Sequence, residues 1–107
     1  MCGLTGFLHD SNDDHGRDKL ERVLEAMTST LVPRGPDSKG IFIDNKIALG
    51  HRRLKIIDLS DNGSQPMQVR KNGPVISYNG EIYNFQLLKN ELSQLGHNFR
   101  GNSDTEV

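Results

Sequence analysis

The sequence contains a single cysteine, Cys2, which directly follows the initiator methionine. If Met1 is removed, a thiol and a free α-amino group are attached to the same carbon. A thiol with an ordinary pKa is only a few per cent ionised at neutral pH, so it needs a base to become a strong nucleophile. An α-amino group titrates at roughly pH 7.7–8.0 and can act as that base. Cys2 is therefore a candidate N-terminal nucleophile, although a buried, unreactive cysteine in a strand is the alternative.

Attack on a carbonyl group also requires hydrogen-bond donors for the negative charge that develops on the oxygen atom. The stretch YNGEIYN (residues 78–84) places the side-chain amide of Asn79 beside the backbone N–H of Gly80. Glycine allows the backbone to come close to a ligand. These two residues are a candidate oxyanion hole, although Asn-Gly is also common in hairpin turns. The neighbouring Glu81 and Asn84 make this turn unusually polar.

Two further charged residues are candidates for ligand binding. Arg53 precedes the apolar residues Leu54, Ile56 and Ile57, as expected of an anchored guanidinium that binds a carboxylate with two hydrogen bonds. A solvated arginine at the end of a strand is the alternative. Asp104 could bind an ammonium group, or it could simply favour the first turn of a helix.

Composition narrows the class of protein. The chain has 107 residues, enough for one small domain, and its 13 basic and 14 acidic residues give a net charge of −1. This balance argues against a nucleic-acid or membrane surface. No apolar run approaches the roughly 20 residues of a membrane span, and no signal peptide is evident, so we expect a cytoplasmic protein. The four histidines show no ligand spacing with the cysteine, so we expect no metal site.

The elements that must position these residues can be read from the hydrophobic pattern. Helices are expected at residues 17–31 and after Asn84, a candidate N-cap, with Gly96 as the stop. The first of these helices would bury one apolar stripe, formed by Leu20, Val23, Leu24, Met27 and Leu31. A polar turn is expected at residues 10–16. Strands or extended segments are expected at residues 2–9 and 52–60. Residues 40–45 and 47–51 are expected to form a hairpin around Asn45, and residues 69–79 a second hairpin with its turn at Asn72-Gly73. Residues 97–103 are expected to form a short strand and a loop. The final SDTEV has the form of a capping box and predicts the start of a third helix. Hairpins dominate this order of elements, which indicates an α+β fold with antiparallel sheets.

The whole set of motifs resembles the class II glutamine amidotransferases, which are N-terminal nucleophile hydrolases. The resemblance is closest to the N-terminal part of glutamine-hydrolysing asparagine synthetases. The stretches that carry it occur in the family's order and extend from end to end of the chain: MCGLTGF, RGPDS, GHRRLKIIDLS, QPM, NGEIYN and SDTEV.

This resemblance implies a role for each candidate residue. Cys2 would attack the side-chain amide of L-glutamine, with its own amine as base and the oxyanion held by Asn79 and Gly80. Arg53 would bind the α-carboxylate, and the α-amino group would lie between Glu81 and Asp104. The pocket wall would include Ile56 and Ile57. The reaction would hydrolyse glutamine to glutamate and ammonia through a thioester.

The resemblance also implies a larger assembly. Residues 2–107 would form the N-terminal portion of a glutaminase domain, itself part of a four-layer α/β/β/α sandwich of antiparallel sheets. A C-terminal synthetase domain, absent from this chain, would use ATP and Mg²⁺ to convert aspartate to asparagine; this segment itself would need no cofactor. The oligomeric state stays open, a homodimer included. Two alternatives remain: the same module supplying ammonia to a sugar or peptide acceptor, and an amino-acid-binding module without turnover.

Overall fold

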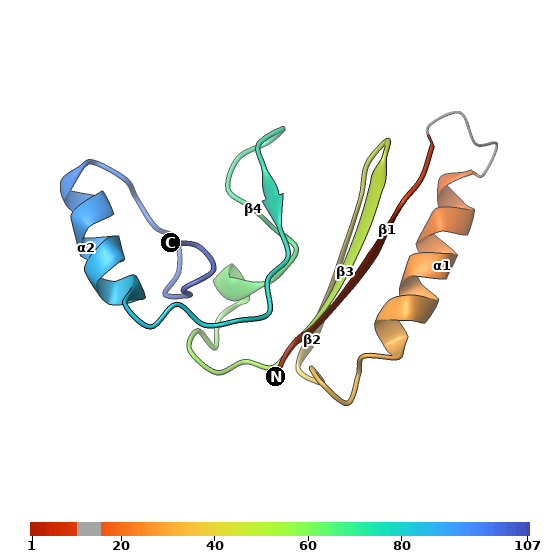
Figure 1. Ribbon diagram of the computed structural model, residues 1–107, viewed down its shortest axis with the longest axis horizontal. Helices are drawn as coiled ribbons and strands as arrows, with labels where there is room; N and C mark the ends of the chain where they lie inside the picture. Colours follow the sequence, from red (N-terminus) through yellow and green to blue (C-terminus); the bar gives the residue numbers. More distant parts are fainter. Residues whose placement is uncertain (11–15) are drawn as a thin grey trace.

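The computed structural model of the protein describes residues 1–10 and 16–107 (Figure 1). Its elements are β1 (Gly3–Leu8), α1 (Arg17–Ser29), β2 (Ser38–Ile43), β3 (Ile47–Arg53), the short 3-10 helix η1 (Asp61–Gly63), β4 (Met67–Gln68), β5 (Val75–Ile76) and α2 (Phe85–Gln94). Every strand pair in the described residues is antiparallel, which confirms the predicted α+β class. The polar turn expected at residues 10–16 lies mostly outside the described residues.

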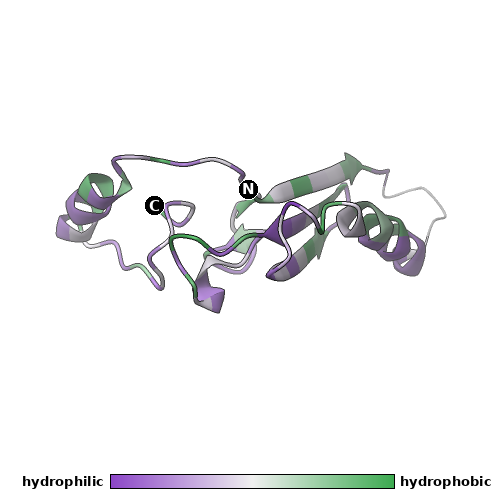
Figure 2. Cartoon of the chain, turned by 90° about the horizontal axis from the view of Figure 1, so that it is seen from below, coloured by the Kyte–Doolittle hydropathy of each residue, from purple (hydrophilic) through white to green (hydrophobic). Residues whose placement is uncertain are grey.

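The largest sheet has three strands in the order β1-β3-β2, with β3 in the centre and α1 against one face (Figure 1). The core between helix and sheet contains Leu24, Ile43 and Ala48, of which Leu24 and Ala48 are fully buried. Figure 2 shows hydrophilic residues of α1 on the side away from the sheet. The apolar stripe predicted for this helix is therefore confirmed at Leu24, whereas Val23, which the stripe also included, is 44% exposed.

The β2–β3 hairpin forms around Asn45 as predicted, and its turn is held by the preceding aspartate. The Asp44 carboxylate accepts hydrogen bonds from the backbone N–H groups of Lys46 at 2.9 Å and Ile47 at 3.1 Å. Both bonds lower the pKa of Asp44, and the bond from Lys46 has the larger effect. This aspartate turn fixes the register in which Ile43 lies opposite Ala48.

The second predicted hairpin is also present, as the two-stranded sheet β4–β5 on the other side of the main sheet from α1 (Figure 1). Its turn and second strand lie where they were predicted, but its first strand precedes the predicted residues 69–79. Asn72 adopts a positive φ of 61° in its turn, a conformation that asparagine tolerates better than most residues. Gly96, with φ of 93°, ends α2 where the sequence predicted a stop. None of the helices in the described ranges is long and apolar enough to cross a membrane.

The prediction of an extended segment at residues 52–60 is wrong beyond Arg53, where β3 ends. The Arg53 guanidinium donates to the backbone carbonyl of Ser60 at 2.7 Å and to that of Asp58. Because both carbonyls lie on the segment that follows the strand, this segment folds back around the side chain instead of continuing straight.

The predictions for the C-terminal part hold only in part. Residues 97–103, all of them described, form loop and bends, so the loop is confirmed and the short strand is wrong. Residues 104–106 form a single turn where the start of a helix was expected. Half of the capping box is present, because the Ser103 hydroxyl accepts the N–H of Glu106 at 3.3 Å. The Glu106 carboxylate, however, accepts from Arg100 and Gly101 and so closes the turn on itself. Asn84 precedes α2 as predicted, but its side chain makes no capping hydrogen bond.

Close packing of α1 on β3 gives a test of this fold. A Cβ atom at Gly50 would lie 2.1 Å from the Thr28 hydroxyl oxygen, so Gly50→Ala should lower the free energy of unfolding by about 1–3 kcal/mol. Urea denaturation measures this loss. The double variant with Thr28→Ala, which removes the obstructing group, should be less destabilised than the sum of the two single variants. Full additivity would contradict this packing.

Candidate functional site

A cavity of about 410 Å³ lies where the end of β3, the N-terminus, the loop after β5 and the turn at residues 103–105 meet. All eight residues that the sequence singled out line it: Cys2, Arg53, Ile56, Ile57, Asn79, Gly80, Glu81 and Asp104. These residues are distant in sequence, so the fold brings them together. Their chemical roles remain predictions, because a shared cavity shows proximity and not activity.

The Cys2 thiol lies against the backbone of the residue that follows β3. Its Sγ accepts the N–H of Leu54 at 3.3 Å and is 3.7 Å from the Leu54 carbonyl oxygen. The side chain is partly buried, whereas Met1 is 74% exposed. The sulfur is therefore held at the cavity wall, and the peptide bond before it is at an accessible chain end.

The loop with the sequence RGPDS, residues 34–38, binds the backbone on both sides of the contact between Cys2 and Leu54. Arg34 donates from Nε to the carbonyl of Cys2 at 3.1 Å, and the Asp37 carboxylate accepts the N–H of Lys55 at 2.8 Å. Arg52 donates to the carbonyl of Gly35 at 2.8 Å. A Cβ atom at Gly35 would lie 2.4 Å from the Arg52 carbonyl, so only glycine permits this close approach. The loop thus holds the start of β1 and the segment after β3 in fixed relative positions.

Arg53 is 6% exposed, and its guanidinium is surrounded by backbone. Besides its bonds to the carbonyls of Asp58 and Ser60, it lies against Gly63, where a Cβ atom would be 2.1 Å from Nη2. In the part of the chain that the structure describes, no carboxylate forms an ion pair with it. The guanidinium has further N–H groups, and its charge is available to an anion in the cavity.

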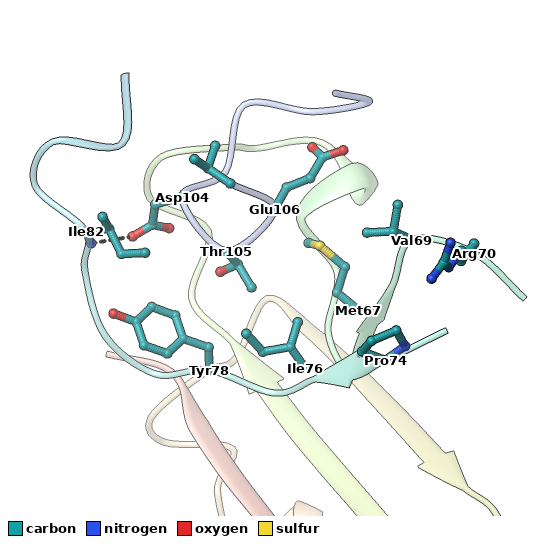
Figure 3. A pocket seen from close by; sticks show the side chains of 11 residues that line it. Met67, Val69, Arg70, Pro74, Ile76, Tyr78, Ile82, Asp104, Thr105 and Glu106 are labelled. Atoms are coloured by element: carbon teal, nitrogen blue, oxygen red, sulfur yellow. Dashed lines mark hydrogen bonds between the residues drawn. The ribbon is translucent and has the colours of Figure 1, made fainter. Parts of the chain in front are cut away.

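Asp104 is also 6% exposed, and it faces the cavity from the C-terminal turn. One carboxylate oxygen accepts the N–H of Ile82 at 2.9 Å, the bond drawn dashed in Figure 3. Figure 3 views this group from a neighbouring cavity of about 570 Å³, whose wall includes the apolar side chains of Met67, Ile76 and Ile82. Asp104 therefore stands in a wall shared by two cavities and ties the turn to the loop after β5.

The candidate oxyanion hole lies on that loop. Asn79, Gly80 and Glu81 are exposed and line the cavity. A Cβ atom at Gly80 would lie 2.4 Å from the hydroxyl of Tyr78, so the ring packs directly over this glycine. The carbonyl of Tyr78 lies 3.3 Å from Nε2 of His51, a fully buried residue on β3. The central strand β3 thus positions the loop after β5 through His51.

Several residues that line the cavity were not identified from the sequence as site residues. The most connected of them are Asp58, which is 6% exposed, and Gln65, which is 8% exposed. Gln65 accepts the N–H of Tyr78 at 2.5 Å and donates to the Thr105 hydroxyl at 3.2 Å. Asp58 lies in the motif GHRRLKIIDLS and Gln65 in the motif QPM, but only tertiary contacts show what their side chains bind. Across residues 1–10 and 16–107, no three His, Cys, Asp or Glu side chains cluster as a metal site would require.

Comparison with known proteins gives a consistent assignment. The glutamine amidotransferase domain family matches residues 1–107. The chain is 41% identical over 107 residues to glutamine-hydrolysing asparagine synthetase 1 of Bacillus subtilis and covers 17% of that protein. It is 39% identical over 107 residues to glutamine-hydrolysing asparagine synthetase 1 of Arabidopsis thaliana, again 17% of its length. It is also 37% identical over 117 residues to amidase chry2 of Gibberella zeae.

The chain therefore belongs to the glutamine amidotransferase domain family, which confirms the class that the motifs indicated. Each of these matches includes the whole chain, which spans about a sixth of the length of the curated relatives.

The buried His51 should make the stability of the fold depend on pH. Burial, and secondarily the Arg53 charge, lower the pKa of His51 below 6.5, although the bond to Tyr78 acts in the other direction. Below about pH 6.5 His51 binds a proton more readily in the unfolded chain than in the folded chain, so the free energy of unfolding should fall as the pH falls. Urea denaturation at about pH 7.5 and 5.5 measures this loss. His51→Gln should flatten the dependence, and the exposed His97→Gln should not; equal slopes in all three proteins would refute the assignment.

Proposed function

We propose that this domain hydrolyses L-glutamine to glutamate and ammonia with Cys2 as the nucleophile. The observation that carries the proposal is the single cavity in which Cys2, the Asn79-Gly80 pair, Arg53 and Asp104 lie together. Membership of the glutamine amidotransferase domain family supports the substrate. The proposed fold context is the four-layer α/β/β/α sandwich of N-terminal nucleophile hydrolases, of which the sheet, α1 and the β4–β5 hairpin would form part.

The chemistry begins once Met1 has been removed. The free amine of Cys2 accepts the thiol proton while Sγ attacks the γ-carbonyl carbon of glutamine. The side-chain amide of Asn79 and the N–H of Gly80 donate to the oxygen as it becomes negative. The C–N bond then breaks, the amine's proton passes to the leaving nitrogen, and ammonia departs. Water hydrolyses the resulting γ-glutamyl thioester, which releases glutamate and restores the thiol.

The two ends of the substrate would meet opposite charges. Arg53 would bind the α-carboxylate with N–H groups that its contacts to Asp58 and Ser60 do not use. The α-amino group would be bound by Glu81 and Asp104. Ile56 and Ile57, which are 69% and 42% exposed in the chain alone, would cover the methylene groups. A site of this kind discriminates against ligands that lack either charged group, because the unmatched protein charge would be left unpaired.

We further propose that the domain is the N-terminal part of a longer cytoplasmic enzyme of the asparagine synthetase type. The relatives named for glutamine-dependent asparagine synthesis support this view, as does the chain's small share of their length. Ammonia would then react with aspartate in a C-terminal synthetase domain that uses ATP and Mg²⁺. The similarity to amidase chry2 favours a second candidate, in which the same glutaminase module supplies a different acceptor.

Replacement of the nucleophile tests the proposed function. In the full-length protein, Cys2→Ala should reduce glutamine hydrolysis and glutamine-dependent synthesis to background, because no thioester can form. Synthesis from added ammonia should continue near the wild-type rate. Product analysis with each nitrogen source measures both activities. Persistent glutamine hydrolysis would rule out Cys2 as the nucleophile, and loss of the ammonia reaction as well would contradict two separate sites.

A conservative change at Arg53 tests substrate binding. Arg53→Lys keeps the charge but loses the planar fork, so the KM for glutamine should rise about tenfold or more while kcat changes less. Arg52→Lys is the matched control, because Arg52 is not among the residues that line the cavity and its guanidinium donates to the carbonyls of Gly35 and Pro36. Steady-state glutaminase kinetics measure the difference. An unchanged KM in Arg53→Lys would remove this residue from the carboxylate site.

A further inference from the structure

The proposed substrate site needs a fixed distance between two charges that lie on separate segments. Arg53 is at the end of β3, and Asp104 is in the turn at residues 100–106. No ion pair joins the two residues in the described ranges. Some other group must therefore hold these segments at the separation that an amino acid requires.

Asp58 makes that connection through both its carboxylate and its backbone. One carboxylate oxygen accepts the N–H of Ser60 at 2.8 Å and the Ser60 hydroxyl at 2.6 Å. The other accepts the N–H of Asn102 at 2.7 Å, two residues before Asp104. The backbone carbonyl of Asp58 accepts from the guanidinium of Arg53. One residue thus contacts the arginine directly and holds the turn that carries the opposite charge.

The turn at residues 100–106 couples the position of Asn102 to that of Asp104, because the turn is closed by its own hydrogen bonds. The Glu106 carboxylate accepts from Arg100 at 2.7 Å and from Gly101 at 2.8 Å. A Cβ atom at Gly101 would lie 2.7 Å from the Asp58 carboxylate, so the backbone approaches as closely as glycine allows. A shift of Asn102 would consequently move Asp104 with it.

We propose that Asp58 is a positioning residue that sets the distance between Arg53 and Asp104 and so selects ligands with an α-amino and an α-carboxylate group on one carbon. This inference rests on the proposed function. Asp58 would not touch the reacting atoms, and the Cys2 thiol is held by Leu54 instead. The hydrogen bonds from Asn102 and Ser60 lower the pKa of Asp58 to about 2, so the carboxylate is a charged acceptor at neutral pH.

The isosteric variant Asp58→Asn separates this role from a general loss of structure. Its amide group would place a donor against the N–H of Asn102 or the donors of Ser60, without a change in volume. Gln65 still joins Thr105 to Tyr78, so the displacement should be local. Asp61→Asn is the matched control, because the side chain of Asp61 lies in the same loop but is 94% exposed.

The experiment compares two reagents that alkylate Cys2 in the full-length protein. The chloroketone analogue of glutamine carries both amino-acid charges, whereas iodoacetamide carries neither. In Asp58→Asn, alkylation by the analogue should slow about tenfold, and alkylation by iodoacetamide should stay within about twofold. The KM for glutamine should rise with a smaller change in kcat, and Asp61→Asn should match the wild type.

Other outcomes would overturn the inference. Equal slowing with both reagents would mean that the whole site is disturbed, and no slowing with either would mean that Asp58 is dispensable. If Asp58→Asn does not fold, Gly101→Ala applies the same test from the other side of the contact and must show the same selective loss. A wild-type protein in which the analogue reacts no faster than chloroacetone, and which does not hydrolyse glutamine, would instead refute the proposed function.

Discussion

The burial of the Arg53 guanidinium at the end of the central strand is the interaction on which the rest of this site depends. A buried charge is costly unless polar groups surround it, and here backbone carbonyls of the following segment supply them. The same hydrogen bonds end β3 and turn the chain back, so they create the loop that lines the cavity. Since carbonyls carry no net charge, these hydrogen bonds solvate the guanidinium without neutralising its positive charge.

The neighbouring loops secure this arrangement by contacts between backbone and side chains. Arg34 holds the carbonyl of Cys2, and Asp37 holds the N–H of Lys55 on the segment after β3. His51 and Gln65 both bind the backbone of Tyr78, just before the candidate oxyanion hole. These bonds join residues distant in sequence, so Cys2 and the residues around it keep their positions only while the sheet is intact.

The sequence predicted α1, the β2–β3 hairpin and the β4–β5 hairpin, because these follow from local hydrophobic periods and turn residues. It also singled out eight residues that line one cavity. The lone cysteine, the Asn-Gly pair and charged residues beside apolar runs form a recognisable pattern, whereas Ile56, Ile57 and the role of Glu81 came from the family resemblance. It could not predict that the chain bends after Arg53 or that residues 97–103 contain no strand. The bend depends on hydrogen bonds from the Arg53 side chain to backbone carbonyls of the following loop, and residues 97–103 are bound by Lys89 of α2. Side-chain contacts of this kind leave no hydrophobic period in the sequence. For the same reason Asp58 was read only as part of a motif.

The electrostatics of the cavity follow from these long-range contacts. Arg53 and Asp104 are each 6% exposed and each is solvated by backbone groups, yet neither neutralises the other. If the two charges met directly, they would satisfy one another and leave little to attract a ligand. Because separate segments hold them apart, in the proposed site a zwitterion would neutralise both at once, and a ligand with one charge would leave the other unmatched. Selectivity for an amino acid would thus arise from the separation of two well-solvated charges, which the backbone of the loops maintains.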